Sequence, residues 1–66
     1  MKSADEILQT ALRKEKRARD FYDGLVFQCG VEMVRELVER LRDEEAKHVK
    51  MIETMLSQLR LGHDPA

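Results

Sequence analysis

The chain has 66 residues, and its 12 basic and 13 acidic side chains leave a formal net charge of -1. A chain this short forms one domain at most, and so small a core needs a staple or a partner chain to be stable. Balanced charge of this kind argues against nucleic-acid binding, and no apolar run is long enough to span a membrane.

The first predicted helix spans about residues 4–28. Ser3 and Glu6 have the spacing of a capping box, in which each side chain bonds a free backbone N–H at the start of the helix. Cys29 and Gly30 form the predicted turn, with Gly30 able to adopt the left-handed conformation that ends many helices. A lone cysteine excludes an internal disulfide. Because no apolar segment follows Met1 either, we expect a reducing, cytoplasmic setting.

The second predicted helix spans about residues 31–60. Gly62 and Pro65 end it, and residues 61–66 are expected to form a frayed tail. Strong helix formers dominate both segments. The sequence therefore predicts an all-α fold, a single domain that consists of an antiparallel two-helix hairpin.

Each helix carries a mainly apolar seam. Its members recur at alternating steps of four and three residues, the heptad pattern that points one stripe of a helix at its partners. In the first helix the seam consists of Ala4, Leu8, Ala11, Glu15, Ala18, Tyr22, Leu25 and Cys29. In the second it consists of Val34, Val38, Leu41, Glu45, His48, Ile52, Met55 and Leu59. The members that need an explanation are Glu15, Glu45 and His48.

These three residues lie at one height of the hairpin. Glu15 precedes Gly30 by fifteen residues, and Glu45 follows it by fifteen. At a rise of about 1.5 Å per residue both lie about 22 Å from the turn, so they face each other in an antiparallel hairpin. His48 lies one turn beyond Glu45 on the same side. A carboxylate in an apolar seam is costly unless it is compensated, and a metal ion compensates it directly.

Three ligands per chain are too few for two metal ions. A two-fold dimer supplies four glutamates and two histidines, and the four negative charges balance two divalent cations. Mixed oxygen and imidazole donors suit iron, with manganese as the alternative. We therefore expect two iron ions per dimer, held by Glu15, Glu45 and His48 of each chain, in a homodimer or a larger homo-oligomer.

The same stretch, about residues 11–56, carries a family resemblance. The residues that carry it are Glu15, Phe21-Tyr22 and Glu44-Glu45-Ala46-Lys47-His48. They resemble one half of a ferritin-like, rubrerythrin-like di-iron carboxylate protein, in which two helices each give a Glu and two give a Glu-x-x-His. Among such proteins the chain is similar to the short two-helix type, such as the encapsulated ferritins. The resemblance implies a hairpin that dimerises into a ferritin-like four-helix bundle.

The resemblance also implies roles for individual residues. Glu15 and His48 would be terminal metal ligands, Glu45 would bridge the two metals, and Tyr22 would be a hydrogen-bonding neighbour of the site. Glu44 lies off the seam, as a solvated residue or a neighbour that helps metal entry. The expected activity is oxidation of Fe(II), as a ferroxidase or a rubrerythrin-like peroxidase, with the three ligands as catalytic residues. Because these 66 residues hold no four-cysteine iron centre, peroxide reduction would need an external electron donor.

Two other interpretations remain open. In the first, the three polar seam residues are a structural layer that fixes register in a non-catalytic dimerisation or adaptor module, with Arg19 or Arg42 pairing the carboxylates. In the second, the metal is purely structural. His63 is not expected to be a ligand, and the basic residues within 13–19 are expected to be a solvated face. Further apolar residues flank the seams and are expected to pack in a core or interface: Ile7, Phe21, Met33, Leu37 and Met51.

Overall fold

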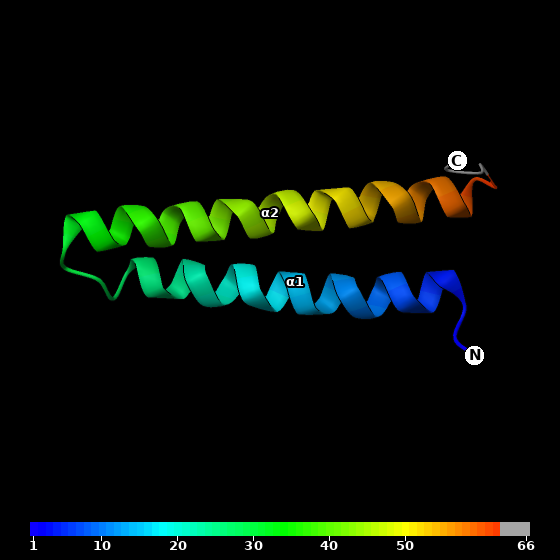
Figure 1. Cartoon of the computed structure of the whole chain (residues 1–66), viewed down its shortest axis with the longest axis horizontal. Helices are drawn as coiled ribbons and strands as arrows, with labels where there is room; N and C mark the ends of the chain where they lie inside the picture. The colour runs from blue at the N-terminus through cyan, green and yellow to red at the C-terminus, as the bar shows by residue number, and fades with distance from the viewer. Residues whose placement is uncertain (63–66) are drawn as a thin grey trace.

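The computed structural model describes residues 1–62, and these form two antiparallel helices with no strand between or beside them. Helix α1 spans Ala4–Val26 and helix α2 spans Glu32–Arg60. Helix α1 lies beside α2 along its length, with the N-terminus and the end of α2 at one end of the hairpin and the turn at the other (Figure 1). The predicted all-α hairpin is therefore confirmed.

Helix α1 begins where the capping pattern places it. The Ser3 hydroxyl accepts a hydrogen bond from the backbone N–H of Glu6 at 3.2 Å, which satisfies one free donor of the first turn. The Glu6 carboxylate does not reach back to the backbone as predicted. It accepts a hydrogen bond from the Ser3 hydroxyl at 3.2 Å instead. Only one arm of the predicted capping box is present.

The connection between the helices is longer than predicted. It covers residues 27–31, since α1 ends at Val26, two residues before the predicted end. The prediction of a left-handed Gly30 is wrong, because within the described residues the only positive φ, 75°, belongs to Gly62. Gly62 ends α2, where its N–H donates to the carbonyl of Leu59 at 3.1 Å. Of the predicted frayed tail, residues 63–66 lie outside the described part of the chain.

The core within one hairpin is very small. It consists of Leu12, Val49 and Leu56, with Leu8 and Ile52 packed against them. The buried three are not members of the predicted seams, and each follows a seam residue by one position. The stripe that contacts the other helix of the same chain is therefore rotated away from the seam. Much of the seam lies at the border of this contact, as expected for helices that also face a further partner.

One side of the contact between the helices is charged. We call it the ion-pair edge, and its members form three pairs between α1 and α2: Asp5–Arg60 at 3.6 Å, Lys16–Glu53 at 3.9 Å and Asp23–Arg42 at 3.2 Å. The three α1 members are spaced by 11 and 7 residues, and so are the three α2 members. That spacing keeps each set on one stripe of its helix.

The opposite side of the contact is apolar and open. We call it the apolar face, and its large exposed members are Ile7, Phe21, Leu37, Leu41 and Met51. Leu41 belongs to the seam itself, and helical periodicity places the other four on the far side of each seam from the ion-pair edge. No helix within residues 1–62 has the length and hydropathy needed to cross a bilayer.

Candidate metal centre

The three polar seam residues converge at the middle of the hairpin. Glu15 is the central residue of α1, and Glu45 and His48 lie one turn apart near the centre of α2. Nδ1 of His48 lies 3.7 Å from Oε2 of Glu15 and 3.5 Å from Oε2 of Glu45. Ligand-type atoms of all three residues lie within 4.8 Å of one another. The structure thus brings together the three predicted ligands.

The surroundings of Glu45 disfavour the charged form of its carboxylate. Its Oε2 atom is buried and makes no hydrogen bond to any described residue. The pKa of Glu45 is raised, first because the Glu15 carboxylate can accept a hydrogen bond only from protonated Glu45. Burial and the negative charge of Glu15 raise it further, and His48 opposes the shift. The folded chain therefore favours a positive charge or a proton at this oxygen.

These residues fit a metal ion with oxygen and nitrogen ligands. A cation among them would neutralise the two carboxylates and give the buried oxygen of Glu45 a partner. The His48 side chain is 46% exposed, compared with 20% for Glu45. His48 lies on the side of Glu45 that borders the apolar face, so the cluster is open in that direction.

The structure does not support a polar layer in which arginines pair the carboxylates. Arg19 bonds Asp20 at 3.1 Å, and Arg42 bonds Asp23 at 3.2 Å and Asp43 at 3.2 Å. Both arginines thus bond aspartates, and neither forms an ion pair with Glu15 or Glu45 among the described contacts. Among the described contacts, His48 is the one basic side chain whose nitrogen lies within 4.0 Å of a site carboxylate.

The two predicted neighbours of the site lie apart from this cluster. Tyr22 follows Glu15 by seven residues, about 10 Å along α1, and its ring meets Phe21 edge-on at 5.5 Å between centroids. Its hydroxyl makes no hydrogen bond within residues 1–62, so its role stays a prediction. Glu44 is exposed and accepts a hydrogen bond from Lys47 at 3.1 Å, as expected for a solvated residue.

Other ionisable residues do not extend the site. Within residues 1–62 no further histidine, cysteine, aspartate or glutamate joins the cluster. Cys29 lies in the connection, where its thiol donates to the carbonyl of Val31 at 3.4 Å. His63 lies outside the described residues. In the basic stretch, Lys16 pairs with Glu53 and Arg19 with an adjacent aspartate, so that stretch is at least partly neutralised.

Comparison with known proteins adds an independent finding. The family model described as Rubrerythrin matches residues 6–66 of the chain. No curated protein and no solved structure matches it. The matched segment covers both helices and the Glu15, Glu45 and His48 cluster, in a family that usually binds iron. The chain belongs to the rubrerythrin family.

Proposed function

We propose that two copies of this chain bind two iron ions at a shared centre and oxidise Fe(II) there. One observation carries the proposal: Glu15, Glu45 and His48 converge around a buried Glu45 oxygen that no described residue bonds. Family membership supports iron as the metal, with manganese as the alternative. A single hairpin supplies three of these ligands, which is half of the set found in four-helix di-iron proteins.

The extent of exposed surface supports a second copy. The accessible surface of the hairpin is 5317 Å², whereas a monomeric protein of 7.7 kDa exposes about 4,300 Å². The excess of about 1,000 Å² is close to the ~800 Å² that each partner buries in a standard interface. The apolar face is the surface that a second hairpin would cover, since the ion-pair edge already pairs its charges within the chain.

Covering the apolar face would also complete the site. His48 borders that face, so a two-fold partner brings a second set of the same three ligands to it. Four carboxylates then balance the charge of two divalent ions. Burial between two hairpins would exclude bulk water from the centre. In this arrangement Glu15 and His48 of each chain would hold the ions as terminal ligands and Glu45 would be shared between them, as the family resemblance implies.

The chemistry divides between the metal and the chain. Bound iron supplies the electron transfer to O2 or peroxide. The chain's own residues would bind Fe(II), balance its charge with their carboxylates and exclude bulk water from the centre. A ferroxidase takes its electrons from Fe(II) itself, whereas a peroxidase needs an external electron donor. We place the reaction in the cytoplasm, in keeping with the single free thiol of Cys29.

Anaerobic titration with Fe(II), followed by admission of air, tests the proposal. We expect about one iron per chain and oxidation faster than in buffer alone, because each dimer offers two metal positions. Glu45→Ala and His48→Ala should each abolish both. Glu36→Ala is the matched control, since Glu36 is an exposed glutamate of the same helix.

The outcomes separate the alternatives. Iron binding without oxidation would indicate a structural metal. No uptake, together with no change in melting temperature on addition of Fe, Mn or Zn, would leave a helical dimerisation module as the explanation. Light scattering gives the assembly: a stable folded monomer of 7.7 kDa that still binds two irons would contradict the shared centre.

A further inference from the structure

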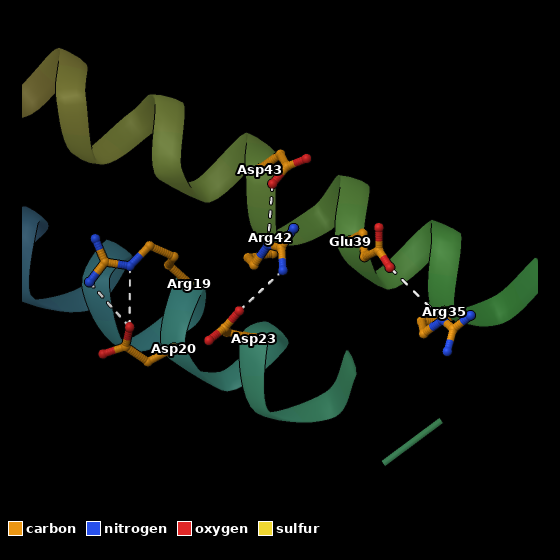
Figure 2. Close-up of polar contacts among 7 residues, drawn as sticks. All are labelled: Arg19, Asp20, Asp23, Arg35, Glu39, Arg42 and Asp43. Carbon is orange, nitrogen blue, oxygen red and sulfur yellow. Dashed lines mark hydrogen bonds and ion pairs between the residues drawn. The ribbon is translucent and has the colours of Figure 1, made fainter. Parts of the chain in front are cut away.

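The three cross-helix ion pairs are distributed along the length of the hairpin. Asp5–Arg60 lies near the termini, Lys16–Glu53 near the level of the candidate centre, and Asp23–Arg42 towards the turn. Figure 2 shows Arg42 reaching from α2 to Asp23 on α1, with Asp43 beside it on the same helix. Hydrogen bonds to Asp23 and then to Asp43 raise the pKa of Arg42 above its ordinary value.

The apolar contacts alone do not determine how far α2 is displaced along α1. A heptad seam repeats every seven residues, so a shift of one heptad still places most apolar residues against apolar residues. Such a shift moves α2 by about 10 Å along α1. Glu15 would then lie level with Val38 and Leu41, or with Ile52 and Met55, and the ligands would separate.

The charges distinguish these registers. If α2 moves so that residues seven positions earlier face α1, Asp5 lies opposite Glu53, which carries the same charge. Asp23 then lies opposite Arg35, which is an attractive pair. If α2 moves the other way, Lys16 lies opposite Arg60. Both shifts lose native pairs, and both place like charges side by side.

We propose that the ion-pair edge sets the register at which Glu15 meets Glu45 and His48. Its members are positioning residues, and they act on the far side of the seam from the apolar face. Each pair is weak alone because it is exposed. The three act together, since a single displacement breaks all of them. The inference rests on the proposed function for its consequence, metal binding, but the register itself can be measured without metal.

The competing explanation is that the short connection sets the register by itself. The connection has five residues, 27–31, and the start of α2 extends past the end of α1 at the turn (Figure 1). A shift that brings earlier α2 residues against α1 shortens the span of the connection, whereas the opposite shift lengthens it and requires the end of one helix to unwind. Helix ends fray readily, so the connection limits the shift without forbidding it. An experiment must therefore change the charges and leave the connection unchanged.

The test measures a distance between spin labels in the metal-free protein. Nitroxides are placed at Gln9→Cys and Ser57→Cys, two positions at the same level on α1 and α2, in a Cys29→Ser background. Labelled chains are diluted with unlabelled ones, so that only distances within one chain are recorded. Pulsed electron paramagnetic resonance then reports the register directly.

Two charge variants are compared with the parent. The first reverses the α2 members alone, with the substitutions Arg42→Asp, Glu53→Lys and Arg60→Asp. In the native register this variant places like charges opposite each other at all three pairs. When α2 residues seven positions earlier face α1, Asp5 lies opposite the lysine of Glu53→Lys, and Asp23 lies opposite Arg35. The second variant also carries Asp5→Lys, Lys16→Glu and Asp23→Lys. It restores three attractive pairs in the native register and the original net charge.

We expect the first variant to lengthen the label distance, since its helices shift by about 10 Å, and to bind Fe(II) about tenfold or more weakly than the parent. The second variant should regain both parental values. An unchanged distance in the first variant would show that the connection alone sets the register, and the proposal would be wrong. If the distances shift as expected while the parent binds no iron, the register proposal stands and the proposed function fails.

A first variant that loses its helical circular dichroism is replaced by one pair. Arg42→Asp should broaden the distance distribution and weaken Fe(II) binding, and adding Asp23→Lys should reverse both effects. Lack of change in the first, or lack of rescue in the second, would contradict the proposal. If Arg42 affected only the local stability of α2, adding Asp23→Lys would not restore the parental values. Rescue by the exchanged pair therefore distinguishes the two explanations.

Discussion

At the scale of single residues, Glu45 has opposite effects on folding and on metal binding: its carboxylate lowers the stability of the metal-free chain and provides a ligand for a metal ion. Its buried Oε2 has no hydrogen-bond partner among the described residues, and its nearest carboxylate neighbour carries the same charge. An apolar residue there would pack without this cost. A glutamate with a raised pKa at a cluster of ligand-type atoms is typical of a functional position.

The first prediction concerns Glu45→Gln. The amide occupies the same space, carries no charge and can donate a hydrogen bond to Glu15. We therefore expect a higher melting temperature than the parent at pH 7 without metal, and no further rise when Fe(II) is added anaerobically. Glu36→Gln on the exposed side of α2 serves as the control and should change neither value. Lower metal-free stability combined with a retained metal effect would refute this account of Glu45.

The second prediction concerns pH. The folded-state pKa of Glu45 lies above its ordinary value of about 4.5, so the folded chain binds this proton more tightly than the unfolded chain does. Ionised Glu45 therefore lowers the free energy of unfolding by the full amount at pH values above its folded-state pKa. This loss of stability becomes smaller as the pH falls towards the pKa of Glu45 in the unfolded chain. Metal binding has the opposite dependence, because protons compete for the same oxygen.

Chemical denaturation at a series of pH values measures both trends. The contribution of Glu45 is the difference between the parent and Glu45→Gln, which removes effects shared by all other groups. Relative to Glu45→Gln, we expect the metal-free parent to have a lower free energy of unfolding at pH 7, and this deficit to shrink as the pH falls towards 4.5. Fe(II) affinity should fall over the same interval. A deficit that grows as the pH falls would show that the pKa of Glu45 is not raised.

At the scale of the helices, capping and glycine placement determine where each element ends. The Ser3 hydroxyl bonds the first turn of α1, and Gly62 supplies the positive φ that ends α2. Gly24 differs from Gly62, because it lies inside α1 with an ordinary helical φ. Apart from its chain neighbours and the nearby backbone of α1, a Cβ atom added at Gly24 would meet no atom within 4 Å. Gly24 therefore weakens α1 without serving its geometry.

The third prediction follows from this difference. Gly24→Ala should stabilise the protein by about 0.5–1 kcal/mol, because alanine loses less backbone entropy on forming a helix. That gain corresponds to a melting temperature higher by about 2–8 °C in a domain of this size. Gly62→Ala is the matched control and should give no gain, since its φ of 75° strains any residue with a Cβ. Equal effects of the two substitutions would contradict the argument.

At the scale of the whole molecule, a single hairpin is too thin to enclose its own core. Its smallest dimension is 14 Å, and its buried residues among those described are Leu12, Val49 and Leu56. Two hairpins joined through their apolar faces would bury Leu37 and Met51, which are 53% and 67% exposed in one chain. Stability and site assembly would then both depend on protein concentration.

The fourth prediction tests that dependence. Leu37→Glu places a charge on the apolar face at a position that is already half exposed within the hairpin, so it should weaken the dimer more than the single hairpin. Sedimentation should show a shift from twice 7.7 kDa towards 7.7 kDa, with loss of Fe(II) binding. Ser57→Glu is the control, since it adds the same charge at an exposed position of α2 that helical periodicity places beside the ion-pair edge. A Leu37→Glu variant that remains dimeric would place the interface elsewhere.

Sequence periodicity was sufficient to predict the hairpin and the three residues that converge in it. Two unbroken helical patterns and one glycine between them leave few other folds. Glu15, Glu45 and His48 stand out because they are charged or polar members of apolar seams. Glu15 and Glu45 lie at equal distances from Gly30, and His48 lies one turn beyond Glu45. Such predictions succeed because helix rise and periodicity are local properties, which a short segment of chain determines.

Tertiary structure decided what depends on the rotation of one helix against the other. It placed Leu12, Val49 and Leu56 in the core, each one position after a seam residue, and paired Arg42 with Asp23 of the other helix. Independently of that rotation, the glycine with a positive φ is Gly62 and not the predicted Gly30. A heptad seam defines a stripe that several partners can share, so it does not say which partner each residue meets. That choice depends on the combined packing and charge of both helices, which no segment of the sequence shows by itself.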